Sequence, residues 1–335
     1  MADWKPVNGV WLQGALDTDQ LPQTLNYARD QNIEYLFPTT QTLNKDGKFT
    51  IDDSFIKALY LFMKNVKEYE ESAGIKFKVL PVIKAPLKKL EQQESPENTE
   101  EGLDLGNGKS RDTAIESISR FIRPDVEGSF VKDIPREFDG VQFSVVDDRD
   151  GYDYEMLKRF LRGIRSALPG KTTSLATTEF SKFWEWSRFY YAGKCVDLLV
   201  PLFNYPETMT DEEVGTFVKD QVRDILTGVS GNYARDHPTP AVKVLFGFPG
   251  YPENGGEKVV EDTAATSEKG ATIAEGAVEK VRKSLEENAD TAGLAGGVSI
   301  SLYLPPPVKK DTSSGVSFAW VVVAAAIVLL LRSAL

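Results

Sequence analysis

The chain has 335 residues, of which 41% are hydrophobic and 10% aromatic, so it can bury a sizeable core. Its net charge of −11 argues against a nucleic-acid partner, because contacts to phosphates require clustered Lys and Arg side chains. One cysteine (Cys195) excludes an intrachain disulfide, one histidine (His237) argues against a His-rich zinc site, and we expect neither a metal nor a cofactor.

Eight short apolar runs recur along the chain, and each is rich in Val, Leu, Ile or Phe and too short for a typical helix. Such near-continuous runs are typical of parallel strands that are covered on both faces. We expect strands at residues 9–15, 33–40, 77–85, 138–146, 172–180, 196–205, 242–251 and 296–304.

Amphipathic stretches lie between these runs, and several open on Asp, Ser or Thr and close on Gly or Asn, which are helix-capping residues. They include residues 17–31, 52–74, 154–170 and 210–231. Alternating strands and helices predict an α/β fold, a (β/α)8 TIM barrel over residues 1–304. A doubly wound open sheet is the alternative.

Two longer stretches interrupt this alternation. Residues 91–112 follow the third predicted strand and residues 253–272 follow the seventh, and both are rich in acidic residues and Gly. We expect both to be loops at the C-terminal end of the barrel, where loops of this kind build active sites. Ordinary solvated loops are the alternative.

The C-terminal segment is strongly apolar. Residues 316–331 carry no charge, and residues 316–335 are twenty in number, about the ~20 that span the hydrocarbon core of a bilayer. We therefore expect a transmembrane helix over residues 316–335, in contact with the lipid bilayer, and a stalk over residues 305–315.

The charges that flank this predicted span indicate its orientation. Lys309 and Lys310 precede it and Arg332 follows it, and the positive-inside bias then places the barrel on the cytoplasmic side, as in a tail anchor. The first ten residues contain no apolar core of a signal peptide. A glycolipid-anchor signal at the small residues 312–315 is the alternative, with the barrel outside.

Polar and aromatic residues stand where the predicted strands end. Amides, hydroxyls, carboxylates and one lysine at this rim suit a polyhydroxyl ligand, and no phosphate-binding glycine motif occurs. Trp11 lies in the first predicted strand, where it is either a stacking platform for a sugar or part of the core. The rim residues are Gln13, Gly14, Thr39, Thr40, Lys84, Asp147, Asp148, Thr178, Glu179, Asn204, Tyr205, Tyr251 and Tyr303.

Four segments resemble strands of the family-18 glycoside hydrolases, the chitinases and their lectin-like relatives. FDGVQFSVV (138–146) is similar to the family's FDGxDxDxE, and KVLFGFPGY (243–251) is similar to KLxLGxPxYG. GGVSISLYL (296–304) is similar to GGVxxW, and VDLLVPLFNYPE (196–207) to the sixth strand. The resemblance extends over roughly residues 7–304 and implies a chitinase-like barrel.

The chain departs from this family at its acids. The resemblance places the two intermediate aspartates at Gln142 and Ser144 and the catalytic glutamate at Val146. In the family the glutamate protonates the glycosidic oxygen, which a valine cannot do, and general acid catalysis contributes roughly 10²–10⁴ in rate. The tryptophan of the eighth strand is also replaced. The resemblance therefore implies lost or weak hydrolase activity.

Other carboxylates could replace the missing acid. Side chains alternate along a strand, so residues 142, 144, 146 and 148 are expected to face the barrel interior. Asp148 would then stand ~6.6 Å beyond Val146, and Glu179 follows the fifth strand. Asp148 and Glu179 are candidate catalytic residues; solvated rim acids are the alternative.

The sequence thus indicates a membrane-anchored, chitinase-like protein that binds an oligosaccharide. One alternative is an active glycoside hydrolase that uses Asp148 and Glu179, and another is a scaffold that acts through protein contacts. The candidate ligand-binding residues are Gln13, Gln142, Ser144, Asp147, Asn204, Tyr205 and Tyr251.

Overall fold

The computed structural model describes residues 7–14, 16, 19–87, 102–145, 154–178, 195–203, 210–231, 243–248, 279–287 and 295–304. The strands within these residues form one parallel sheet, in which β1 pairs with both β9 and β2 and so closes the sheet into a barrel. The strands are β1 (Val7–Gly14), β2 (Tyr35–Thr42), β3 (Lys78–Val79), β4 (Val82–Ala85), β5 (Gly140–Val145), β6 (Thr172–Thr178), β7 (Leu198–Leu202), β8 (Lys243–Phe248) and β9 (Ala295–Leu304). The predicted closed barrel of parallel strands is confirmed, and the open-sheet alternative is wrong.

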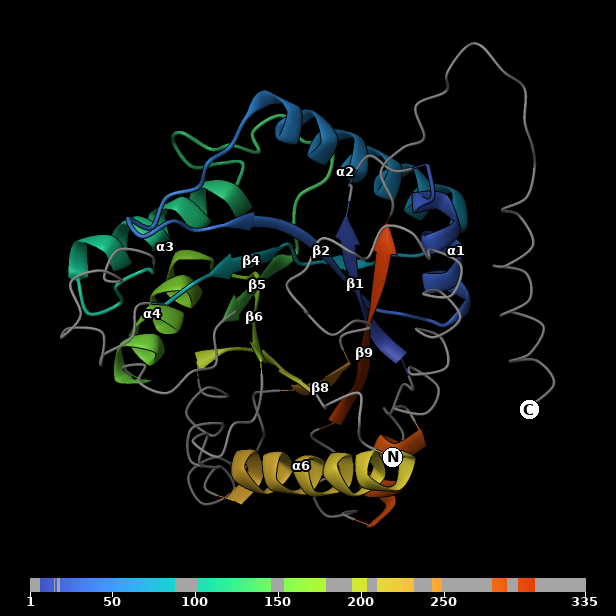
Figure 1. Ribbon diagram of the computed structural model, residues 1–335. Coiled ribbons are helices and arrows are strands. Elements are labelled where there is room, and N and C mark those ends of the chain that lie inside the picture. The colour runs from blue at the N-terminus through green and yellow to red at the C-terminus, as the bar shows by residue number, and fades with distance from the viewer. Residues whose placement is uncertain are drawn as a thin grey trace.

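The described helices lie around the outside of the strands (Figure 1). Four of them match the predicted amphipathic stretches. The helices are α1 (Leu21–Asp30), α2 (Asp53–Ala73), α3 (Gly108–Ile122), α4 (Tyr154–Ala167) and α6 (Asp211–Gly231), and residues 279–287 are also helical.

Capping groups mark both ends of α2 and the start of α3. The Asp52 carboxylate accepts the backbone N–H of Phe55 and caps the start of α2, which ends at Gly74 in the left-handed conformation (φ 65°). The Asn107 side chain caps α3 in the same way. Because α3 begins at Gly108, the end of the predicted loop 91–112 is helical, and the prediction was wrong for residues 108–112.

The third predicted strand, residues 77–85, is divided into β3 and β4. Leu80 and Pro81 separate the two pieces. Proline has no backbone N–H to donate to a neighbouring strand, so it interrupts the hydrogen-bonded ladder. The Pro81 carbonyl still accepts the N–H of Gln142, which keeps β5 beside this segment.

Apolar side chains form two cores, one on each side of the barrel wall. The outer core packs the helices against the strands; Phe143 of β5, for example, meets Phe160 of α4 edge-on at 5.0 Å between ring centroids. The inner core fills the barrel. It consists of Trp11, Tyr35, Phe37, Leu80, Val82, Ala176, Leu198, Val200 and Leu245, with the partly buried Leu202 against it.

Strand β5 enters the barrel at Asp139 and Gly140. The Asp139 N–H donates to the carbonyl of Val79, and the Asp139 carbonyl accepts the N–H of Thr172. A Cβ atom on residue 140 would lie 1.9 Å from the carbonyl oxygen of Thr172. Glycine is therefore required for β5 and β6 to approach this closely.

No helix among the described residues is long and apolar enough to cross a membrane. The predicted stalk (305–315) and span (316–335) lie outside the described residues.

Replacing Gly140 with alanine is expected to lower the free energy of unfolding by about 3 kcal/mol, because the added methyl group overlaps the Thr172 carbonyl and forces the strands apart. Urea denaturation measures this change. The control is Gly215→Ala in α6, where the nearest atom is 4.0 Å away and the substitution should stabilise by roughly 0.5–1 kcal/mol. Equal stability of Gly140→Ala and wild type would contradict the expectation.

Candidate functional site

Because every strand pairing is parallel, the C-terminal strand ends meet at one mouth of the barrel. None of the nine strands contains Asp or Glu. Their charged residues are three lysines, of which Lys78 and Lys243 start their strands and Lys84 stands near the end of β4. Lys84 is therefore the charged strand residue closest to the mouth.

A hydrogen-bonded chain of polar side chains crosses the barrel interior. The Trp11 indole Nε1 of β1 donates to Gln142 Oε1 of β5 at 2.5 Å, although the two residues are 131 positions apart. Gln142 Nε2 in turn donates to Ser174 Oγ of β6 at 3.3 Å. Gln142 is completely buried, and both ends of its amide are used inside the protein.

The Trp11 ring packs among other residues of the inner core. Its centroid lies 5.7 Å from that of Phe37, which stacks on Tyr35 at 5.9 Å. On the far side, a Cβ atom on residue 247 of β8 would lie 2.6 Å from the indole. Gly247 therefore leaves room for the ring, and at this level the interior is a filled core.

Ser144 and Lys84 lie one layer closer to the mouth than Gln142. Alternation along β5 puts Ser144 on the same interior face as Gln142, and Ser144 is 8% exposed. Ser144 is paired in register with Lys84 of β4 and with Ala176 of β6. Ser144 and the partly buried Lys84 thus stand side by side above the floor formed by Trp11 and Gln142.

The structure brings together two of the predicted site residues. Gln142 and Ser144 both face the interior, as the alternation on β5 predicted. The backbone of Gln13 lies in β1. The remaining predicted residues lie outside the described residues, so their predicted roles stay predictions. They are Asp147, Asp148, Glu179, Asn204, Tyr205 and Tyr251, and Val146 lies there as well.

Two residues of this interior, Trp11 and Ser174, were not predicted to belong with Gln142. Trp11 was expected either to stack on a sugar or to join the core, and it is 6% exposed within the inner core. Alternation from Gln13 places Trp11 on the interior face, but no sequence pattern identifies the strand opposite. Among the described residues, no group of His, Cys, Asp and Glu is placed to hold a metal ion.

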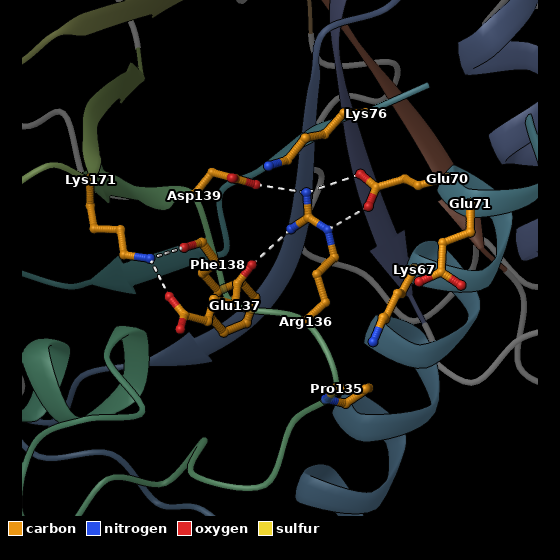
Figure 2. Close-up of a pocket in the computed structure, with 10 residues that line it drawn as sticks. All are labelled: Lys67, Glu70, Glu71, Lys76, Pro135, Arg136, Glu137, Phe138, Asp139 and Lys171. Atoms are coloured by element: carbon orange, nitrogen blue, oxygen red, sulfur yellow. Dashed lines mark hydrogen bonds and ion pairs between the residues drawn. The ribbon is translucent and has the colours of Figure 1, made fainter. Parts of the chain in front are cut away.

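The opposite, N-terminal end of the barrel has a hollow of about 500 Å³ lined by the end of α2 and the segments before β5 and β6. Figure 2 shows Arg136 between Glu70 and Asp139 in this hollow. The guanidinium makes two bonds to the Glu70 carboxylate, at 2.9 and 3.0 Å, and one to Asp139 at 2.8 Å. Burial lowers the pKa of Arg136, but the bonds to Glu70 and the charge of Asp139 outweigh it and raise the pKa.

These ion pairs join separate elements of the barrel bottom. Glu70 also accepts the N–H of Phe77, next to β3, and Asp139 accepts the N–H of Val79. Lys171 bridges Glu137 and the carbonyl of Phe138. In barrels of this type the N-terminal end serves stability and the C-terminal end carries the active site, so we place the candidate site at the mouth.

No protein-family model matches this chain, and no curated protein matches it. Among solved structures, a chitinase from Bacteroides thetaiotaomicron has a TM-score of 0.52 at 16% identity, over 89% of this chain and 90% of that chain. The spore cortex-lytic enzymes SleL of Bacillus cereus and Bacillus megaterium QM B1551 have TM-scores of 0.50 and 0.52 at 15% and 14% identity. The aligned regions include 90% and 91% of this chain, respectively, and 72% of each SleL chain.

The chain shares the fold of these enzymes. The chitinase-like architecture that the four strand motifs indicated is thus confirmed at the level of the fold.

Replacing Gln142 with leucine is expected to lower the free energy of unfolding by about 1–3 kcal/mol, because the buried indole N–H of Trp11 loses its acceptor. Urea denaturation of Gln142→Leu, Trp11→Phe and the double variant measures their coupling. We expect the double variant to lose less stability than the two single losses added together. Ser174→Ala is the control, and we expect it to change the free energy of unfolding only slightly, because the hydrogen bond from Gln142 to Ser174 is long. Strictly additive losses for Gln142→Leu and Trp11→Phe would contradict the prediction.

Proposed function

We propose that the chain is a membrane-anchored, chitinase-like barrel protein that binds carbohydrate at the mouth of the barrel and has lost most or all hydrolase activity. The observation that carries this proposal is the set of residues on the interior face of β5. The strand keeps its Asp139–Gly140 entry and its place in the barrel, while its two described interior positions hold a glutamine and a serine.

The lost-activity part of the proposal rests on acid chemistry. Cleavage of a glycosidic bond requires a group that protonates the leaving oxygen. Gln142 and Ser144 have no acidic proton at neutral pH, and none of the described strands supplies a carboxylate. Gln142 is enclosed below Ser144, so its proposed contribution to binding is to hold Trp11 in the floor.

The binding part rests on shape and residue type. Above the floor, Ser144 and Lys84 offer a hydroxyl and an ammonium, and Leu202 at the end of β7 offers a partly exposed apolar surface. Gln13, Asp147, Asn204, Tyr205 and Tyr251 stand at or beyond the ends of neighbouring strands in the sequence. Hydroxyls, amides and tyrosine rings are the groups that bind sugars by hydrogen bonds and stacking.

An active hydrolase is the second candidate, and the pairing of β5 with β6 favours it. These strands are neighbours, with Val145 in register with Thr177. In the sequence Asp148 follows the end of β5 and Glu179 follows the end of β6. A pair of carboxylates that flank the scissile bond is the usual requirement for glycoside hydrolysis.

We expect chitotetraose to bind the full-length chain saturably in isothermal titration calorimetry, and Tyr251→Ala to weaken binding about two- to tenfold through loss of ring stacking. Tyr60→Ala is the control, because Tyr60 is an exposed tyrosine (41%) on the outer helix α2. A flat titration of the wild type with chitotetraose would contradict this expectation, and flat titrations with other oligosaccharides as well would sink the binding function and favour the scaffold.

The same preparations separate binding from catalysis. The wild type is expected to release no product from fluorogenic chitooligosaccharides. Hydrolysis by the wild type that disappears in Asp148→Asn and Glu179→Gln would instead establish the second candidate.

Anchoring by residues 316–335 is tested by carbonate extraction of cell membranes. The full chain is expected to stay in the pellet, and a chain that ends at Ser314 is expected in the supernatant, because ~20 apolar residues suffice to span a bilayer. Adding a protease to intact and to permeabilised cells determines the side; the cytoplasmic orientation predicts cleavage of the barrel only after permeabilisation.

A further inference from the structure

Lys84 points into the barrel at its ligand-facing end. On β4, Val82 belongs to the inner core, whereas Ile83 and Ala85 belong to the outer core. Side chains alternate along a strand, so Lys84 shares the interior face with Val82. Its register partner on β5 is Ser144, which places the hydroxyl and the lysine side chain next to each other.

The three strand lysines differ in their surroundings. Lys78 pairs with Glu34 at 2.6 Å and lies over the Tyr35 ring. Lys243 is exposed at the start of β8. Lys84 is partly buried, and no carboxylate among the described residues forms an ion pair with it. Within the described part of the mouth the positive charge of Lys84 is therefore not offset by a carboxylate, and a ligand that supplies a negative charge would bind there favourably.

We infer that Lys84 is an anion-binding residue of the barrel mouth and that the ligand is an oligosaccharide bearing a carboxylate or a sulfate group. The inference rests on the proposed carbohydrate-binding function and specifies its ligand class. The ammonium of Lys84 pairs with one oxygen of the anionic group, and the Ser144 hydroxyl donates to another. A neutral sugar supplies no negative charge to the ammonium, so charge on the ligand determines selectivity.

The experiment compares three tetrasaccharides with the full-length chain in a detergent that has no sugar head group. They are an oligogalacturonate with carboxylates only, a keratan sulfate fragment with sulfates only, and neutral chitotetraose. Binding is measured by calorimetry for the wild type and for Lys84→Met, Lys84→Arg and Lys243→Met. Lys243→Met is the matched control, because it removes a strand lysine at the opposite end of the barrel.

We expect at least one anionic tetrasaccharide to bind more tightly than chitotetraose. Lys84→Met should weaken that binding about tenfold, as the loss of one hydrogen bond to a charged group does, and should weaken chitotetraose binding less. Lys84→Arg should retain most of the affinity, and Lys243→Met all of it. Added salt should weaken anionic binding in the wild type more than in Lys84→Met. The anionic ligand that responds identifies carboxylate or sulfate as the recognised group.

Chitotetraose binding that equals or exceeds that of both anionic ligands would overturn the inference and leave the proposed binding function standing. A uniform loss of all three affinities in Lys84→Met and Lys84→Arg would also overturn it, since it would indicate a structural role for Lys84. Absence of binding by all three ligands would overturn the inference together with the proposed function.

Discussion

The position of β5 in the barrel depends on Asp139. Its backbone N–H donates to the Val79 carbonyl, its side chain accepts the Val79 N–H, and its own carbonyl accepts the N–H of Thr172. These bonds fix the start of β5 against β3 on one side and β6 on the other. Arg136 holds the Asp139 carboxylate in place and binds Glu70 of α2 with the same guanidinium. Three residues further along, Gln142 reaches the interior at the level of Val82 and Ser174, and Ser144 follows one layer above.

This arrangement separates the part of the strand motif that builds the barrel from the part that performs chemistry. Phe138 packs in the outer core against Phe121, Asp139 sets the register, and Gly140 permits the close approach to β6. None of these functions requires an acid at residues 142, 144 or 146. In a closed interior a glutamine satisfies the Trp11 N–H without the desolvation of a carboxylate, which is unfavourable for an isolated buried charge. The Phe138-Asp139-Gly140 entry can therefore build this part of the barrel without an acid at the positions that follow it.

The sequence predicted the barrel well because its signals are local. Each strand is a short apolar run, each matching helix has an amphipathic pattern, and alternation correctly placed Gln142 and Ser144 inside. The break at Pro81 and the start of α3 after Asn107 were missed, although both have local causes, a missing N–H and a capping side chain. The bond between Trp11 and Gln142 was not predictable, because it joins strands on different sides of the barrel and depends on the space left by Gly247.

The distribution of charge bears on what the mouth of the barrel binds. The chain carries 50 acidic residues against 39 Lys and Arg, yet the strands that the structure describes contain no acid. Acids exposed on helices and loops act on an approaching anion through water and salt, which screen interactions beyond about 8 Å at physiological ionic strength. Lys84 is partly buried and would contact the anionic group of the ligand directly, where salt screens the electrostatic attraction less. The overall negative charge therefore slows the encounter with an anionic ligand more than it weakens the bound state, and it excludes polyanions that cannot bring a charged group down to Lys84.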